Sequence, residues 1–167
     1  DIKPDNVMIR EDRLVKVLDF GIAKLDPAIA GATDSEAETR VEAATTPGMI
    51  IGTPQYMSPE QAAGDLSRIS ERTDVYALGV ILYEIITGKK PYSCTTVKEA
   101  VEKIIREAPI PVTEREPNAP PALAAVCAQA MEKDPAKRYA SAVDLAEEIN
   151  RFLSGALVEA YEYRFTE

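Results

Sequence analysis

The sequence has few cysteines, fewer basic than acidic residues and no long apolar run, and each shortage excludes a class of site. Its two cysteines, Cys94 and Cys127, lie far apart without metal-ligand spacing, so we expect two free thiols in a reducing cytosol. The 167 residues carry 19 lysines and arginines against 28 aspartates and glutamates, and a net charge of −9 argues against a nucleic-acid-binding surface. We find no signal peptide, internal repeat or transmembrane run.

The residues that are present suffice to build one substantial core. With 46% hydrophobic residues, the chain is most simply one domain. Residues 74–88 are apolar almost all round, which predicts a buried helix that ends at Gly88. Glu84 interrupts this stretch, which is also too short to cross a bilayer.

Two polar strings near the start of the chain carry most of its information. Asp1, Lys3 and Asn6 lie in the first string, and Asp19 opens the second, an Asp-Phe-Gly sequence. Residues 7–18 hold two β-branched, apolar runs around a polar break, which predicts a small hairpin. A hairpin would return Asp19 to the neighbourhood of Asp1 and Asn6, where carboxylate and amide oxygens suit Mg²⁺. Each of these residues alone is a common turn residue, and their order and spacing favour a shared site.

Together the two strings resemble the catalytic loop and the metal-binding loop of eukaryotic-like (Hanks-type) protein kinases, in the serine/threonine-specific form. The resemblance implies that Asp1 accepts the proton of the substrate hydroxyl and that Lys3 steadies the γ-phosphoryl group of ATP. It also implies that Asn6 and Asp19 hold the metal ions, so ATP and Mg²⁺ are the expected cofactors. The overall style of the sequence is similar to that of bacterial serine/threonine kinases.

Residues 52–60 form a third string, which resembles the end of a kinase activation segment. Read locally, Ser58 is a good helix N-cap, a proline follows at the first helical position, and Glu60 complements the helix dipole. This local reading explains only part of the string. The resemblance implies that the loop receives the substrate peptide and that the Thr53 hydroxyl bridges the catalytic aspartate and lysine.

Two further motifs resemble structural parts of the kinase large lobe. Asp74, at the start of the predicted buried helix, is implied to anchor the backbone of the catalytic loop; the alternative is an ordinary acid at a helix N-terminus. Residues 133–139 are similar to a late signature of the family, in which Arg138 forms a buried ion pair with Glu60. A planar guanidinium can meet a carboxylate in two hydrogen bonds, which lysine cannot do. The alternative for Arg138 is a surface arginine in a turn.

Residues 25–50 differ from the rest of the chain in composition, because they are rich in Ala, Thr, Glu and Gly and poor in large apolar residues. They lie within residues 22–59, which the resemblance identifies as the activation segment. Thr45 and Thr46 are the favoured phosphorylation sites, since acidic residues earlier in the segment oppose added negative charge. A solvated linker with incidental hydroxyls is the alternative.

We therefore expect a mainly α fold, the α+β large lobe of a kinase, with a helical bundle around the buried central helix and a small β-hairpin at the catalytic loop. Residues 1–153 would form this C-terminal lobe, truncated at the catalytic loop, and residues 154–167 a tail or linker. Further helices are expected after Thr96, over residues 122–131 and after Ser141.

The sequence lacks the Gly-x-Gly-x-x-Gly loop that kinases place over the phosphates, and it begins within a motif. We therefore expect a fragment without the small lobe that has little or no activity alone. The parent protein would be a kinase that transfers the γ-phosphate of ATP to Ser and Thr hydroxyls of protein substrates. We expect it in the cytoplasm, or on the cytoplasmic membrane face if segments outside this chain anchor it.

Two other classes of protein fit some of these motifs. A pseudokinase or scaffold would keep the fold without phosphotransfer, but intact Asp1, Lys3, Asn6 and Asp19 argue against it. A small-molecule phosphotransferase can share an Asp…Asn…Asp core, but it has no use for residues 52–60.

Overall fold

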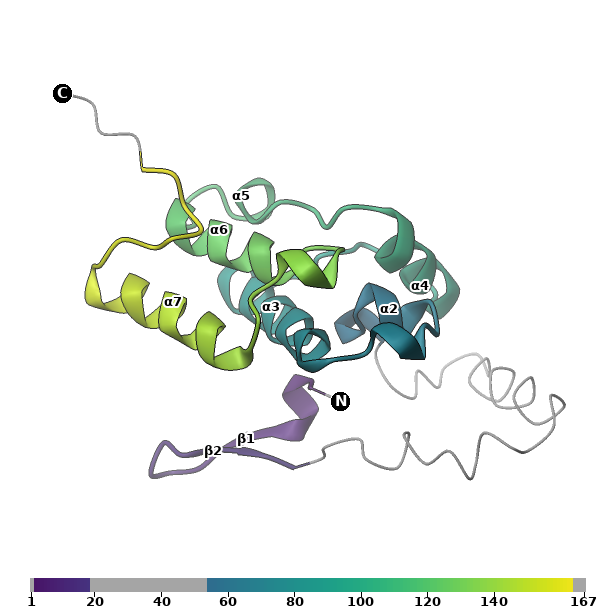
Figure 1. The fold of residues 1–167 in the computed structure, drawn as a ribbon, viewed down its shortest axis with the longest axis horizontal. Coiled ribbons are helices and arrows are strands. Elements are labelled where there is room, and N and C mark those ends of the chain that lie inside the picture. Colours follow the sequence, from purple (N-terminus) through teal and green to yellow (C-terminus); the bar gives the residue numbers. More distant parts are fainter. Residues whose placement is uncertain (1, 19–53, 164–167) are drawn as a thin grey trace, which may run out of the picture. The chain divides into compact units, whose positions relative to one another are not determined.

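The computed structural model describes residues 2–18 and 54–163 (Figure 1). The chain divides into two compact units, Asp1–Thr53 and Pro54–Glu167. The described part of the first unit is a hairpin, and that of the second unit is helical. The prediction of a mainly helical fold with a small sheet is therefore confirmed for the described residues.

The hairpin of the first unit pairs β1 (Val7–Ile9) with the antiparallel β2 (Val15–Val17), directly after the 3-10 turn η1 (Pro4–Asn6). The residue pairs across the two strands are Val7 with Val17, Met8 with Lys16 and Ile9 with Val15. The turn between the strands closes with a hydrogen bond from Arg10 N to Leu14 O, 2.9 Å long. The hairpin predicted from the β-branched runs is thus present.

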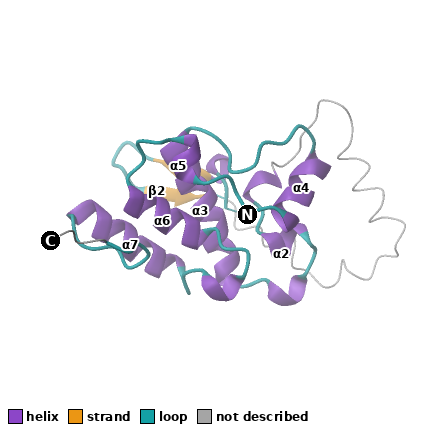
Figure 2. Ribbon diagram, turned by 90° about the horizontal axis from the view of Figure 1, so that it is seen from above, coloured by secondary structure: helices purple, strands orange, loops and turns teal. Residues whose placement is uncertain are grey.

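The helical elements of the second unit are η3 (Pro54–Tyr56), α2 (Pro59–Ala62), η4 (Leu66–Arg68), α3 (Glu71–Thr87), α4 (Val97–Arg106), α5 (Val112–Arg115), α6 (Pro121–Ala130), η5 (Pro135–Lys137) and α7 (Ala142–Ser154). Helix α3 is central, because it contacts α5, α6 and α7. Figures 1 and 2 show α6 and α7 on one side of α3, and α2 and α4 on the other.

The central helix α3 begins and ends with local signals. The Thr73 hydroxyl accepts a hydrogen bond from Ser70 N at 3.1 Å, and Gly88 takes a left-handed φ of 65° that ends the helix. Its fully buried residues include Val75, Tyr76 and Val80. The helix is not buried on every side, because Ile85 is 75% exposed. Within residues 2–18 and 54–163, no helix is long and apolar enough to span a membrane.

The segment after α7, which we expected to be a tail or linker, packs against the helical unit over residues 155–163. Val158 is buried in a core cluster with Tyr139 and Leu145. The Glu148 carboxylate accepts hydrogen bonds from the backbone N–H groups of Glu159 and Ala160, at 2.8 and 3.2 Å. The helical unit therefore includes residues beyond the end of its last helix.

Helices α3 and α6 approach each other closely at Gly79. A Cβ atom at this position would lie 2.8 Å from the Ala130 Cβ and 2.9 Å from the Met131 Cγ. Small residues on both helices thus set the distance between the two.

We predict that Gly79→Ala destabilises the helical unit, because the added methyl group overpacks the contact between α3 and α6. Overpacking costs about 1–3 kcal/mol, which exceeds the roughly 0.5–1 kcal/mol that alanine gains over glycine inside a helix. Urea unfolding of the chain, followed by circular dichroism, measures the change. Adding Ala130→Gly removes the nearest opposing atom and should restore part of the loss; a fully additive double variant would contradict this account.

Candidate active site

The catalytic-loop motif lies in the first unit, around η1. Lys3 precedes this turn, and its carbonyl accepts a hydrogen bond from Asn6 N at 3.0 Å. Both residues are half-buried and take part in interactions. Leu18 N donates to Asn6 O at 2.8 Å, so the strand that leads to the Asp-Phe-Gly sequence ends beside the asparagine.

Several predicted site residues fall outside the part of the chain that the structure describes. They are Asp1, Asp19, Thr53, Thr45 and Thr46. Among the described residues, no three aspartate, glutamate, cysteine or histidine side chains gather as a metal site would require.

The end of the predicted activation segment lies in the second unit and begins α2. The Ser58 hydroxyl accepts a hydrogen bond from Gln61 N at 3.3 Å, and the Gln61 side chain accepts one from Ser58 N at 3.0 Å. This reciprocal pair is a capping box, and Pro59 occupies the first helical position. The local prediction of a helix start at Ser58 is confirmed.

Glu60, one residue further, lies in a buried ion pair with Arg138. Both guanidinium nitrogens meet the carboxylate, at 2.8 Å each, and the side chains of Glu60 and Arg138 are 1% and 0% exposed. Thr73 also donates to Glu60, at 2.9 Å. Burial acts to raise the pKa of Glu60, but the hydrogen bonds and the charge of Arg138 outweigh it, so the pKa is lowered.

The guanidinium of Arg138 satisfies further backbone groups. It donates to the carbonyls of Arg72 at 2.8 Å, Glu132 at 2.7 Å and Lys133 at 3.3 Å, and it lies 4.9 Å from the centre of the Tyr76 ring. These contacts connect α2, the start of α3 and the turn after α6. A buried charge pair is tolerated because its remaining donors all find acceptors.

Arg72 supports this arrangement from α3, and sequence reasoning missed it. It donates to the carbonyls of Pro135 and Ala136 at 2.8 and 2.9 Å, which holds the turn that carries Arg138. Thr73, which donates a hydrogen bond to Glu60, was missed as well. The sequence did offer one indication of a role for Arg72 and Thr73, because they directly precede Asp74, the acid that the family resemblance identifies. Asp74 itself is exposed in the first turn of α3.

A second polar cluster that sequence reasoning missed joins Tyr56, Glu84 and Lys90. Tyr56 belongs to η3, and Glu84 belongs to α3. Nothing in the motifs pointed to Lys90, which follows α3 in the sequence.

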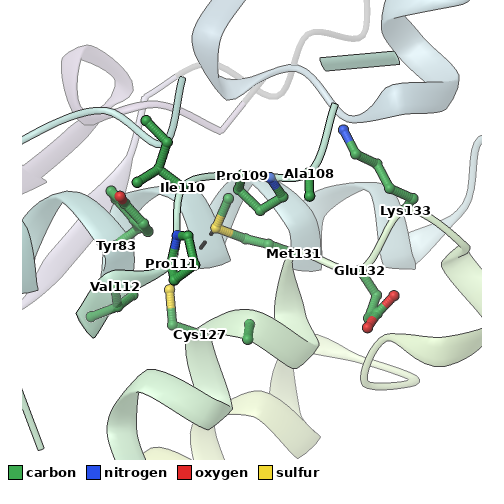
Figure 3. Close-up of a pocket in the computed structure, with 11 residues that line it drawn as sticks. Tyr83, Ala108, Pro109, Ile110, Pro111, Val112, Cys127, Met131, Glu132 and Lys133 are labelled. Atoms are coloured by element: carbon green, nitrogen blue, oxygen red, sulfur yellow. Dashed lines mark hydrogen bonds between the residues drawn. The ribbon is translucent and has the colours of Figure 1, made fainter. Parts of the chain in front are cut away.

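A cavity of about 280 Å³ lies in the same unit, and its lining includes Glu132 and Lys133, whose carbonyls accept hydrogen bonds from Arg138 (Figure 3). Cys127 and Met131 are neighbours in its lining, with their sulfur atoms in contact at 3.9 Å. Burial raises the pKa of Cys127 to about 12, so its thiol is not a nucleophile at neutral pH. Cys94 and Cys127 are both free thiols, as predicted.

A model of the protein kinase domain matches residues 1–152. The chain therefore belongs to the protein kinase family, in its Hanks-type, bacterial form.

Similar proteins are bacterial serine/threonine kinases. The chain is 38% identical to serine/threonine-protein kinase PknB of Mycolicibacterium smegmatis and 41% identical to PknB of Mycobacterium leprae, each over 96% of this chain and 24% of the relative. Serine/threonine-protein kinase pkn3 of Myxococcus xanthus is 43% identical over 85% of this chain and 25% of the relative. The chain thus spans about a quarter of the length of these curated relatives.

We predict that Arg138→Met destabilises the helical unit by about 3–5 kcal/mol, because it leaves the Glu60 carboxylate buried and unpaired. Arg138→Lys should recover only part of this loss, since an ammonium cannot meet both carboxylate oxygens in the same way. Urea unfolding measures both changes. Arg68→Ala is the control, because Arg68 makes an exposed pair with Asp134 at 3.6 Å and should change stability by less than about 1 kcal/mol. Equal effects at the two arginines would refute this assignment.

We predict that Glu60 contributes to acid unfolding. Its pKa in the fold lies below the ordinary value of 4.5, so the unfolded chain takes up this proton at a higher pH than the folded chain. The stabilisation is present above the unfolded pKa and is lost as the pH falls through the folded pKa. The free energy of unfolding, measured by urea titration at a series of pH values, should therefore fall less steeply in Glu60→Gln than in the native chain below about pH 5. Identical pH profiles would show that Glu60 does not titrate differently on folding.

Proposed function

We propose that this chain is the large lobe of a protein serine/threonine kinase, which transfers the γ-phosphate of ATP to Ser and Thr hydroxyls of protein substrates. The observation that carries the proposal is the hydrogen bond from Leu18 N to Asn6 O. It supports a shared site for the two motifs, because Asp19 follows Leu18 in the sequence. The names of the bacterial relatives support the choice of serine and threonine as acceptors.

The donor set fits the metal that this chemistry uses. Asn6 and Asp19 would hold Mg²⁺, a hard cation that prefers amide and carboxylate oxygens together with substrate phosphates. When bound, the ion neutralises charge on the phosphate oxygens.

The remaining residues of the motif have complementary roles in this proposal. The carboxylate of Asp1 takes the proton of the acceptor hydroxyl while the hydroxyl oxygen bonds to the γ-phosphorus and the bond to ADP breaks. Lys3 donates to the γ-phosphoryl oxygens and balances their negative charge. The Thr53 hydroxyl ties Asp1 to Lys3, and Asp74 anchors the backbone of the catalytic loop.

The end of the activation segment would receive the substrate peptide. This role is supported by the way in which the segment is held: Glu60 forms an ion pair with Arg138, and the Tyr56 hydroxyl donates a hydrogen bond to Glu84 of α3. A peptide-binding segment held in this way does not need to be ordered by the substrate, which lowers the entropic cost of binding. Phosphorylation of Thr45 or Thr46 is the proposed control of this segment, through the added negative charge.

We expect Asp1→Asn and Asp19→Ala to lower phosphate transfer by at least about 100-fold, because the first removes the proton acceptor and the second a metal ligand. The assay follows γ-phosphate transfer to a Ser/Thr peptide by the complete protein, since the Gly-rich loop of kinases does not occur in these 167 residues.

Asp5→Asn is the matched control for these two variants. Asp5 is an exposed carboxylate in the same turn as Asn6, and its substitution should leave the rate within about twofold, as is usual for surface sites. Unchanged rates in Asp1→Asn and Asp19→Ala would refute the assignment. A native protein that binds ATP but transfers no phosphate would instead identify a pseudokinase.

A further inference from the structure

Tyr56, Glu84 and Lys90 form a polar cluster where η3 meets α3. The Tyr56 hydroxyl and the Lys90 ammonium both donate to the Glu84 Oε2 atom, at 2.6 Å each. The Lys90 ammonium also lies 3.9 Å from the centre of the Tyr56 ring and contacts its hydroxyl. A cation over an aromatic ring adds to the attraction. One carboxylate and one ammonium thus fasten η3 to the central helix.

This cluster is partly exposed, in contrast to the buried ion pair of Glu60, although its Tyr56 is only 8% exposed. The side chains of Lys90 and Glu84 are 24% and 33% exposed. Burial acts to raise the pKa of Glu84, but hydrogen bonds from Lys90 and Tyr56 and the charge of Lys90 together lower it. The carboxylate is therefore ionised at neutral pH, and Lys90 balances its charge.

We propose that Lys90 determines the charge preference of the peptide-binding surface by neutralising Glu84. The inference rests on the proposed function, which makes residues 52–60 the segment that receives the peptide. With Lys90 present, the surface beside Tyr56 carries one positive and one negative charge at contact distance, and a basic peptide residue gains little there. Without Lys90, the same carboxylate stands uncompensated and attracts a basic residue of the substrate.

The chain carries a net charge of −9, so the effect of this charge has to be distinguished from the effect of the contact between Lys90 and Glu84. An acidic protein attracts basic peptides over long range, but that attraction is screened by salt beyond about 8–10 Å. Selectivity at a given peptide position depends on close contacts, and Lys90 neutralises the Glu84 carboxylate that would make such a contact. Its neighbour Lys89 is exposed and carries the same charge, which provides a matched control for net charge.

The test compares Lys90→Met with Lys89→Met in the complete protein. The substrates are paired Ser peptides that differ only in whether one flanking position is Arg or Gln, with each flanking position scanned in turn. For Lys90→Met, kcat/KM for the Arg peptide relative to the Gln peptide should rise about threefold to fivefold at one position. The gain should shrink as salt is added. Lys90→Arg, which keeps the charge, and Lys89→Met should not show it.

Glu84→Gln in the Lys90→Met background should abolish the gain, since no carboxylate is left to attract arginine. An equal loss for both peptides in Lys90→Met, or the same gain in Lys89→Met, would overturn the proposal. Fluorescence anisotropy with the corresponding Ala peptides measures binding without phosphate transfer. If the native protein transfers no phosphate but the binding preference shifts as expected, the proposed function fails and the role of Lys90 stands.

Discussion

The helical unit depends on the bidentate contact between Glu60 and Arg138. Removing two charges from water costs on the order of several kcal/mol per ion, so the pair is favourable only where every remaining donor and acceptor is satisfied. Here Thr73 donates to the carboxylate, and the carbonyl of Arg72 accepts from the guanidinium. The pair therefore fixes α2 to the start of α3 and to the turn after α6. Because a partly satisfied pair would be strongly unfavourable, this position has little freedom to vary.

The same stretch of chain is held a second time by Tyr56, Glu84 and Lys90, under different physical conditions. A buried pair gains strength from low dielectric, whereas an exposed pair is weak and adjustable. The buried contact is suited to position the segment, and the half-buried contact sets its charge in our proposal. The residues from Pro54 to Glu60 are thus attached twice, by the ion pair of Glu60 with Arg138 and by the hydrogen bond of Tyr56 with Glu84. A change at Lys90 can therefore alter the charge beside the segment while the Glu60 contact keeps the segment in position.

Sequence reasoning succeeded where the determinants are local. The strands around the turn at Arg10, the helix starts at Ser58, Thr96 and Ser141, and the end of α3 at Gly88 all follow from short patterns, and the structure has them. The partner of Glu60, 78 residues away, came from the family resemblance and not from a local pattern. Contacts of Lys90, Thr73 and Val158 were missed because packing between distant segments decides them. The exposure of Ile85 was missed for the same reason, since an all-apolar helix predicts burial on every side.

The contrast between the two units bears on how activity can be studied. The hairpin that follows Lys3 and Asn6 has three residues in each strand, and Ile9 and Val15 are 71% and 61% exposed. A two-stranded hairpin of this kind is marginally stable by itself in water, because it buries little apolar surface. The helical unit, in contrast, has two buried clusters and a satisfied ion pair. The geometry of the catalytic motif must therefore depend on packing beyond the hairpin. The proposed phosphate transfer therefore has to be tested in the complete protein, whereas urea unfolding of this chain reports mainly on the helical unit.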